Sequence, residues 1–254
     1  MQARDGAHSG SDRNSWDLDE LAGAPRLADW MFEQFADAAS GKVIEVGAGI
    51  GTFSSRLLDA GVDELLLIEP DPACAATLRR RFARNRTVRI AAESVPSSPQ
   101  LDGAVGSADF VLCQNVLEHI EDDESALAAM AAALRPGGRL ALLVPAHPRL
   151  FGSLDVAYGH HRRYTREVLA RLAEAAGLEV RDLYTFNALG IAGWWVKSKR
   201  GATRLGAGSL AAYEALVRFW RPIERWVRVP WGLSLILHAE RPDGGGSKRH
   251  RWPI

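Results

Sequence analysis

Short, nearly continuous apolar runs alternate along this chain with longer segments in which apolar residues recur every three or four positions. The first pattern is typical of strands buried on both faces, and the second is typical of amphipathic helices. The predicted strands of the first part are residues 42–46, 64–68, 88–91, 110–113 and 139–144. The predicted helices around them are residues 29–38, a helix following residue 51, residues 72–82 and residues 122–134. This alternation predicts an α/β fold with a parallel sheet that helices cover on both faces.

The pattern changes after residue 145. A loop rich in His, Arg and Gly leads to Thr165, which fits the N-cap of a helix ending at Gly177. Two further strands are predicted at residues 179–185 and 232–239. The segment 187–230 between them is too long for a hairpin, so we predict a helical, Trp-rich insertion with a break near Pro222.

A glycine-rich turn follows the first predicted strand. Residues Glu45–Gly51 read EVGAGIG, and glycines at alternate positions allow the backbone to turn sharply and lie against a ligand. Glu69 ends the second predicted strand, at about the 20-residue spacing of an acid that binds ribose hydroxyls. A carboxylate can accept hydrogen bonds from both hydroxyls. The combination predicts a cofactor that contains a nucleoside.

Two details of this turn indicate which nucleoside is bound. The turn that binds dinucleotides is G-x-G-x-x-G, whereas here the third glycine, Gly51, comes one residue early. The carboxylate of Glu45 would repel a pyrophosphate and suits a ligand that is cationic and carries no phosphate. S-adenosylmethionine fits both details, and an NAD(P)-dependent oxidoreductase is the disfavoured alternative.

The order and spacing of several motifs resemble the class I S-adenosylmethionine-dependent methyltransferases. The matching segments are residues 45–51, 69–71, 115–120 and 134–138. Residues 144–147, 151–155 and 159–165 extend the likeness to a bacterial subgroup that methylates small molecules. We therefore expect a doubly wound, seven-stranded, mostly parallel sheet whose last strand is antiparallel, with S-adenosylmethionine as the cofactor.

The expected cofactor-binding residues lie at the ends of predicted strands or directly after them. They are Glu45, Gly47, Ala48, Gly49, Gly51, Glu69, Pro70, Glu93, Ser94, Asn115 and Val116. The resemblance places Glu93 on the adenine amino group, where many relatives carry Asp, and Asn115 at the methionine end. Asp71 either shares the ribose with Glu69 or caps the next helix. His119 is expected to be a packed residue of the cofactor rim.

Methyl transfer needs a base only when the acceptor is a protonated amine or a weakly acidic hydroxyl. The candidate catalytic residues are His147, His160 and His161, and the same loop also offers Asp155 and Tyr158 as bases. His147 lies two residues past the fifth predicted strand, and its alternative is a loop histidine that caps backbone groups. Of the adjacent His160 and His161, one is expected to reach the active site.

Residues that would bind the acceptor come from the loop and from the aromatic segments. They are Trp30, Arg163, Tyr164 and Trp194. Arg162 and Arg163 either clamp an acidic group of the substrate or pair with acids of the protein. Five tryptophans of the insertion suggest an apolar lid over the acceptor or a packed cap: Trp194, Trp195, Trp220, Trp226 and Trp231. Arginines beside them allow an alternative in which this surface rests on anionic lipid.

Composition narrows these choices. The chain has 254 residues and no formal net charge, so we expect no nucleic-acid partner. The two cysteines, Cys74 and Cys113, fall in a predicted helix and a predicted strand and are expected to be buried thiols. Residues 1–15 and 241–254 are expected to be disordered and 16–240 to form one domain. We expect no secretory signal and a cytoplasmic location. The histidines show no ligand spacing beyond the pair at 160 and 161, so no metal site is predicted.

The sequence predicts a methyltransferase that acts on O or N of a small, apolar or aromatic metabolite. One alternative acceptor is a lipid-linked or glycan precursor at a membrane surface. Another alternative is a protein that binds the cofactor without transferring a methyl group. The oligomeric state and the acceptor stay open.

Overall fold

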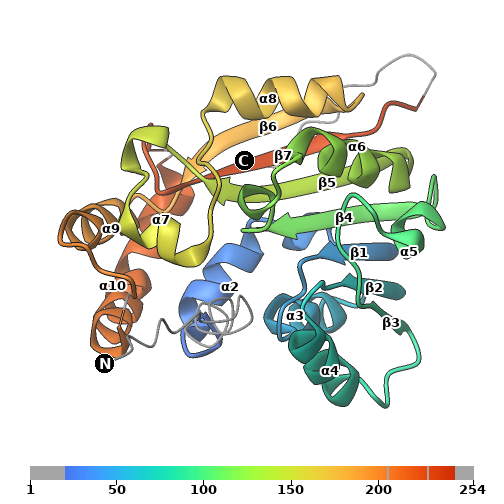
Figure 1. Ribbon diagram of the computed structural model, residues 1–254, viewed down its shortest axis with the longest axis horizontal. Coiled ribbons are helices and arrows are strands. Elements are labelled where there is room, and N and C mark those ends of the chain that lie inside the picture. Colours follow the sequence, from blue (N-terminus) through green and yellow to red (C-terminus); the bar gives the residue numbers. More distant parts are fainter. Residues whose placement is uncertain (1–20, 205, 228, 244–254) are drawn as a thin grey trace, which may run out of the picture.

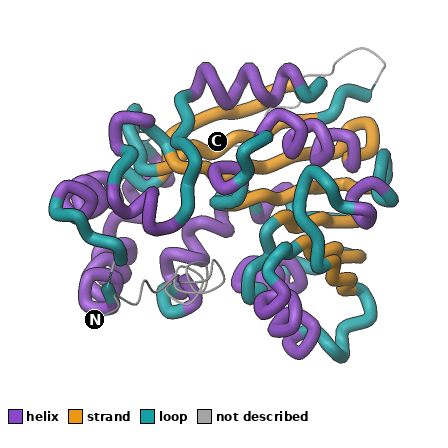
Figure 2. The backbone as a smooth tube through the Cα atoms, in the orientation of Figure 1, coloured by secondary structure: helices purple, strands orange, loops and turns teal. Residues whose placement is uncertain are grey.

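The computed structural model, described for residues 21–204, 206–227 and 229–243, contains a seven-stranded sheet with the order β3-β2-β1-β4-β5-β7-β6 (Figure 1, Figure 2). All pairs from β3 to β5 are parallel, and β7 is antiparallel to both β5 and β6. The expected mixed sheet is therefore confirmed. The strands are β1 (Lys42–Val46), β2 (Glu64–Ile68), β3 (Val88–Ala91), β4 (Ala108–Gln114), β5 (Leu134–Pro145), β6 (Glu179–Phe186) and β7 (Ser234–Glu240).

Helices cover both faces of this sheet (Figure 1). One face packs against α6 and α8, and the other packs against α2, α3 and α4. The helices before the long loop are α2 (Pro25–Glu33), η1 (Ala36–Ala38), α3 (Thr52–Asp59), α4 (Pro72–Arg81), α5 (Pro99–Asp102), η2 (Leu117–His119) and α6 (Asp123–Ala133). Those after β5 are η3 (Pro148–Leu150), α7 (Ser153–Tyr158), α8 (Arg166–Ala175), α9 (Gly190–Lys199) and α10 (Ala207–Trp226).

The apolar runs of the strands supply both halves of the core. Successive side chains of a strand point to opposite faces, so Val43 joins the cluster under α2 and α3 while Ile44 joins the cluster under α6. In the same way Val111 and Leu112 of β4 face opposite sides and are fully buried. Continuous apolar strands therefore need helices on both sides of the sheet.

Two helices have the N-cap residues that the sequence predicts. The Asp71 carboxylate accepts hydrogen bonds from the backbone N–H groups of Ala73 and Cys74 at the start of α4. The Thr165 hydroxyl accepts one from the N–H of Val168 at the start of α8. These bonds satisfy N–H groups that the first helical turn leaves without intrahelical partners. Of the two predicted uses of Asp71, capping is the one observed.

The structure differs from the predicted elements at three places. The predicted helix 29–38 is α2, which begins at Pro25, followed by the short η1. β5 begins at Leu134 rather than after the predicted turn 135–138, because Leu134 pairs with Ala108 and a register shift absorbs the turn. α10 continues through Pro222, so the predicted break is absent, and side-chain bonds from Trp220 to Glu224 and from Arg221 to Glu33 lie beside it.

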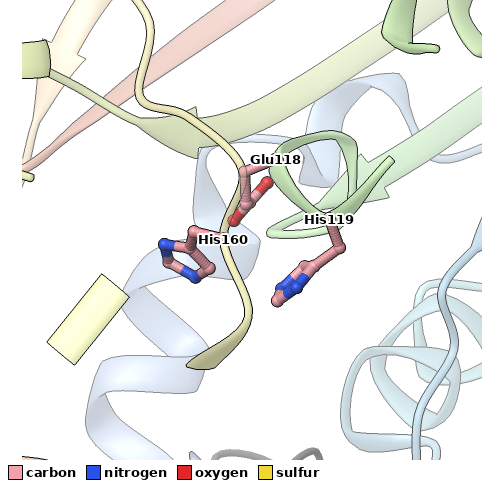
Figure 3. Close-up of side chains that lie close together, drawn as sticks. All are labelled: Glu118, His119 and His160. Atoms are coloured by element: carbon pink, nitrogen blue, oxygen red, sulfur yellow. The ribbon is translucent and has the colours of Figure 1, made fainter. Parts of the chain in front are cut away.

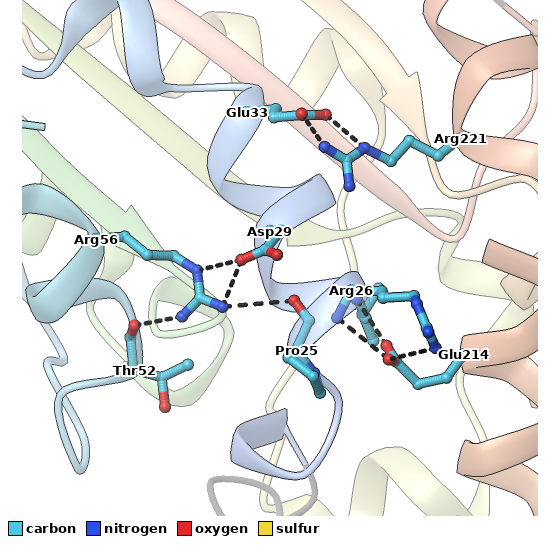
Figure 4. A network of polar contacts seen from close by, with 9 residues as sticks. Pro25, Arg26, Asp29, Glu33, Thr52, Arg56, Glu214 and Arg221 are labelled. Atoms are coloured by element: carbon cyan, nitrogen blue, oxygen red, sulfur yellow. Dashed lines mark hydrogen bonds and ion pairs between the residues drawn. The ribbon is translucent and has the colours of Figure 1, made fainter. Parts of the chain in front are cut away.

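The predicted helical insertion is formed by α9 and α10, between β6 and β7. It is joined to α2 by Glu214 of α10, whose carboxylate accepts hydrogen bonds from the N–H groups of Arg26 and Leu27 (Figure 4). Residue Ala24 provides no side-chain cap for α2, so Glu214 supplies it from a distant part of the chain. No helix of the described residues is long and apolar enough to cross a membrane.

Most of the predicted disordered ends lie outside the described residues. The whole of 1–15 does, and of the tail 241–254 only residues 241–243 are described. There the Arg241 guanidinium donates hydrogen bonds to the carbonyls of Ala132 and Leu134. These contacts hold the chain directly after β7 against the end of α6.

Candidate active site

A cavity of about 430 Å³ opens at the carboxyl ends of the strands. Its walls come from the glycine-rich turn after β1, from the ends of β2 and β4, from the segment around α7, and from α9 and α10. Parallel strands bring these segments to one edge of the sheet, which is where ligands bind in open α/β sheets. The expected location of the site at this edge agrees with the position of the cavity.

The glycine-rich turn is closely packed against the segment after β4. Gly47 has a φ of +76°, and a Cβ atom there would lie 2.1 Å from Cγ2 of Val116. The N–H groups of Gly47 and Ala48 both donate to the carbonyl of Ile68 at the end of β2. Glycine is therefore required at position 47 by both the backbone conformation and the close neighbour.

Glu69 lies at the cavity wall with its carboxylate held by two backbone groups. Oε2 accepts from the N–H of Gly49 at 2.7 Å, and Oε1 accepts from the N–H of Asp71 at 2.9 Å. Burial raises the pKa of this carboxyl group, and the two backbone bonds partly offset the effect. Each oxygen has a further lone pair, so the fixed carboxylate can accept two hydroxyl groups from a ligand.

Glu45 is placed differently from Glu69. It is 3% exposed, it is not among the residues that line the cavity, and its Oε2 accepts a 2.5 Å hydrogen bond from the Ser54 hydroxyl on α3. Burial raises its pKa from 4.5 to about 8, although the Ser54 bond acts in the opposite direction. Glu45 therefore joins the glycine-rich turn to α3 from behind, and its predicted contact with the cofactor stays a prediction.

This buried carboxyl group makes the stability of the protein depend on pH. Its folded-state pKa lies above 4.5, so the contribution of Glu45 to stability is expected to fall as the pH rises from about 4.5 to about 8. The loss can reach about 1.4 kcal/mol per pH unit within that interval. Glu45→Gln keeps an acceptor for Ser54 and removes the charge, so this variant should lose less stability than the wild type over the same pH interval. Urea unfolding of both proteins at several pH values measures the difference, and parallel curves would contradict the assignment.

The other expected cofactor residues divide into two groups. Those that line the cavity are Gly47, Ala48, Gly49, Glu69, Pro70, Asn115 and Val116. Gly51, Glu93 and Ser94 do not. Glu93 is instead occupied at the start of α5, where its Oε2 accepts from the Ser98 hydroxyl and from the N–H of Gln100. For the adenine contact that the resemblance implies, the Glu93 carboxylate would have to accept a further hydrogen bond while it bonds Ser98 and Gln100.

Three strands end in residues with positive φ. Asn115 follows β4 at +51°, His147 follows β5 at +59°, and Asn187 follows β6 at +65°. Asparagine and histidine adopt this conformation more readily than most side chains, but it is uncommon for any residue except glycine. Such outliers gather at functional sites. Asn115 and Asn187 both line the cavity.

Gln114 directly precedes Asn115 and also lines the cavity. Within the described residues, its amide nitrogen and oxygen are buried and have no hydrogen-bond partner. Leaving such a group unsatisfied costs about 1–3 kcal/mol. A polar ligand in the cavity would recover that free energy, so Gln114 fits a site that binds one.

The polar wall of the cavity is built around Asp155, which is 0% exposed. Its Oδ1 lies 2.9 Å from Nδ1 of His160 and accepts from Nε of Arg163 at 2.7 Å. Burial raises the pKa of Asp155, but the bonds from His160 and Arg163 outweigh this and hold the pKa below its usual range. The negative charge of Asp155 thereby orients both His160 and Arg163.

Arg163 is satisfied by the protein. Its guanidinium bonds Asp155 and the carbonyl of Ala146, and it stacks over the Trp194 ring at 4.7 Å. Both Arg163 and Trp194 line the cavity. Of the two predicted roles for Arg163, pairing with an acid of the protein is the one observed. Its guanidinium therefore stabilises the loop between α7 and α8.

Of the three candidate catalytic histidines, the structure brings His160 to the cavity. His161 is exposed and lies outside the lining residues, and its N–H donates to the carbonyl of Glu118. His147 is also outside the lining, with its N–H bonded to the carbonyl of Tyr164. The chain turns away after β5, so proximity to the strand end did not carry this side chain into the pocket.

Two predicted acceptor-binding residues are part of the core. Tyr164 is 1% exposed, and its hydroxyl bonds the Asp123 carboxylate and the Leu117 carbonyl. Trp30 is 2% exposed and packs against Phe186 with ring centroids 4.5 Å apart. Neither residue lines the cavity. Both shape its walls from behind.

The tryptophans of the insertion do not form a common lid. Trp194 is buried and lines the cavity, whereas Trp195, Trp226 and Trp231 are 50%, 85% and 60% exposed. The expectation of a packed cap is therefore wrong for these three residues. Helical periodicity places Trp194 and Trp195 on different sides of α9, so only one of two adjacent residues can face the pocket.

The sequence did not single out Glu118 and Asn187, which both line the cavity, as does the candidate base Tyr158. His119 was expected only as a packed residue. Burial and the nearby His160 lower the pKa of His119 to about 4, so this side chain is neutral at physiological pH. Glu118 and His119 are adjacent on η2, and His160 joins them from a loop 41 residues away. The sequence contains no local spacing that would reveal this group.

Comparisons with known proteins agree with the architecture. A solved geranyl diphosphate methyltransferase shares the fold with a TM-score of 0.63 and 14% sequence identity, over 93% of each chain. An S-adenosylmethionine dependent methyltransferase from Mesorhizobium loti shares it with a TM-score of 0.54 and 14% identity, over 79% of this chain and 90% of that chain.

Two curated relatives are more similar in sequence. A ubiquinone biosynthesis O-methyltransferase of Aeromonas salmonicida is 24% identical over 63% of this chain and 71% of its own length. An uncharacterized methyltransferase of Mycobacterium tuberculosis is 33% identical over 47% of this chain and 44% of its own length. The match thus spans less than half of the mycobacterial protein. The family model described as "Methyltransferase domain" matches residues 22–183, well over half of the chain. The chain therefore belongs to this family of methyltransferases.

Proposed function

We propose that the chain methylates a hydroxyl oxygen of a small, largely apolar or aromatic metabolite. The observation that carries the proposal is the Asp155–His160 pair, which lies at the same cavity as Glu69 and the glycine-rich turn. A site for a nucleoside and a site for an activated hydroxyl are thereby combined in one pocket. The alternatives are methylation at nitrogen, an acceptor attached to a lipid or a glycan, and binding of the cofactor without transfer.

The residues at one end of the cavity fit S-adenosylmethionine. Glu69 offers two carboxylate oxygens to the ribose, and Gly47 and Ala48 present backbone without side chains that would fill the site. The buried amide of Gln114 suits the polar methionine end. The cofactor supplies an electrophilic methyl group on a sulfonium. The protein contributes the alignment of donor and acceptor, which accounts for much of the rate in such displacements.

The other end of the cavity suits an apolar acceptor with a polar group. Apolar residues of the lining come from α2, β6, α10 and the segments before α9 and β7, and they include Met31, Phe186, Leu210, Leu189 and Leu233. Nδ1 of His160 is engaged by Asp155, so Nε2 is the nitrogen available to the acceptor side. The O-methyltransferase relative and the geranyl diphosphate methyltransferase are named for acceptors with apolar portions, which supports this class.

The proposal is tested with labelled S-adenosylmethionine and three acceptors of one ring size: an alkylated catechol, an alkylated phenol and an alkylated aniline. We expect transfer to oxygen, identified by mass spectrometry of the product. His160→Gln should lower kcat about 100-fold or more, as expected for loss of a group that handles a proton. Its S-adenosylmethionine affinity should stay unchanged.

His161→Gln is the matched control, because His161 is the adjacent residue and lies outside the cavity. It should retain wild-type kcat. Transfer to the aniline alone would favour methylation at nitrogen. Equal activity of the two variants would remove the proposed role of His160, and failure of all acceptors despite tight cofactor binding would favour the protein that only binds the cofactor.

A further inference from the structure

Three potential metal ligands converge on the acceptor side of the cavity. Glu118 and His119 come from η2 and His160 comes from the loop after α7, and Figure 3 shows the three side chains turned toward one another. Each can offer one ligand atom such that these atoms all lie within 4.8 Å of one another. All three residues line the cavity, and Glu118 is fully buried. A cation held between them would therefore face the acceptor site.

The surroundings of His160 orient it as a metal ligand. In metal sites, a ligating imidazole almost always uses its second nitrogen in a hydrogen bond to a carboxylate or a backbone carbonyl. His160 does so through Nδ1 to Asp155. The rings of His119 and His160 also meet edge to face, with centroids 4.9 Å apart. One nitrogen of His160 is thus fixed by the protein, and its other nitrogen is left for a ligand.

We propose that Glu118, His119 and His160 bind a divalent transition-metal cation that receives the hydroxyl group of the acceptor. The role of the cation in catalysis rests on the proposed methylation of oxygen. The binding of the cation does not. Two imidazoles and one carboxylate suit Mn²⁺, Fe²⁺, Co²⁺ or Zn²⁺. Three protein ligands leave coordination positions open, as in catalytic metal sites. The one negative charge of Glu118 only partly neutralises a divalent cation, so the site would keep a positive charge that favours binding of an anionic oxygen.

The chemistry balances without a further reactant. The cation lowers the pKa of the hydroxyl that binds it, and the proton passes to water. A bond then forms between that oxygen and the methyl carbon as the bond from carbon to sulfur breaks. The sulfur keeps the electron pair, so the products are the methyl ether and neutral-sulfur S-adenosylhomocysteine. With the cation bound, Nε2 of His160 is a ligand and not the proton acceptor, so the lower kcat expected for His160→Gln would then come from loss of the cation.

Binding is tested directly on the full chain without an affinity tag, stripped of metal with a chelator. Isothermal titration with MnCl₂ and with ZnCl₂ should give one strong site per chain, and CoCl₂ should give a visible spectrum with nitrogen and oxygen ligands. His119→Gln should weaken the strong site at least 100-fold, and His161→Gln should leave it unchanged. Circular dichroism melting without metal checks that both variants fold.

Each outcome separates this proposal from the proposed function. Metal binding lost in His119→Gln supports the metal site even if no acceptor is methylated. Methylation of a hydroxyl that is unchanged by the chelator, with no strong site in the titrations, overturns the metal site and leaves O-methylation standing. Equal binding by wild type and His119→Gln also overturns it, since the cation would then be bound elsewhere.

Discussion

Glu69→Ala is expected to weaken the binding of S-adenosylmethionine about 100-fold while leaving the protein folded. The carboxylate of Glu69 lies at the cavity wall and is held by the N–H groups of Gly49 and Asp71. Hydrogen bonds to a charged group contribute about 1.5–3 kcal/mol each. Loss of two such bonds to the ribose corresponds to roughly 3 kcal/mol, or about two decades in affinity. The variant also frees the N–H of Gly49, which loosens the glycine-rich turn.

Isothermal titration with S-adenosylmethionine and S-adenosylhomocysteine measures the effect. Glu64→Ala is the matched control, because Glu64 begins the strand that Glu69 follows and is paired only at the surface with Lys42 and Arg89. Its affinity should equal that of the wild type. An equal loss of cofactor affinity in both variants would indicate a general change in β2. An unchanged affinity of Glu69→Ala would show that the ribose binds elsewhere.

Asp155→Ala is expected to lower the free energy of unfolding by about 3–5 kcal/mol, the cost of leaving a buried charge without its partner. The side chains of Asp155 and Arg163 are 0% and 1% exposed, and they form an ion pair at 2.7 Å. The N–H of Gly152 also donates to Asp155 at the start of α7. The substitution therefore disrupts the loop that carries His160, so catalysis should be lost together with stability.

Chemical denaturation measures the change, with Asp29→Ala as the control. Asp29 also pairs with an arginine, Arg56, at 2.7 Å, but its side chain is 53% exposed, so its loss should cost less than about 1 kcal/mol (Figure 4). The double variant Asp155→Ala/Arg163→Met should recover part of the loss, because it also removes the uncompensated charge. Similar losses for Asp155→Ala and Asp29→Ala would show that burial of the pair does not matter.

The fold was largely predictable because it depends on patterns that are local in the sequence. The runs at 42–46, 64–68 and 88–91 are the strands β1, β2 and β3 with the same bounds. Pro72 after Asp71, and Thr165 before Arg166, identify helix starts through backbone groups within three residues. The predicted break near Pro222 failed: α10 continues through this residue, where the adjacent Arg221 pairs with Glu33 of α2, far away in the sequence.

The cofactor end of the site was predictable for the same reason. Gly47 and Glu69 are recognised by type and spacing, because a sharp backbone turn needs glycine and two hydroxyls need a carboxylate. The acceptor end was less predictable. His147 is closer to a strand end than His160 is, yet the path of the chain after β5 leaves His147 outside the cavity and brings His160 into it. Asp155, which orients His160, was only one of several loop candidates.

The sequence by itself determined the α/β class, the glycine-rich turn and the acid after β2 at the cavity wall, since each depends on residues a few positions apart or on one strand. Only the tertiary structure decided which histidine reaches the cavity, that Arg163 is neutralised by Asp155, and that Glu118, His119 and His160 meet. The physical reason is that these contacts join η2 to the loop after α7, across a distance in sequence that no periodicity spans. Their geometry is set by how the loops pack above the sheet.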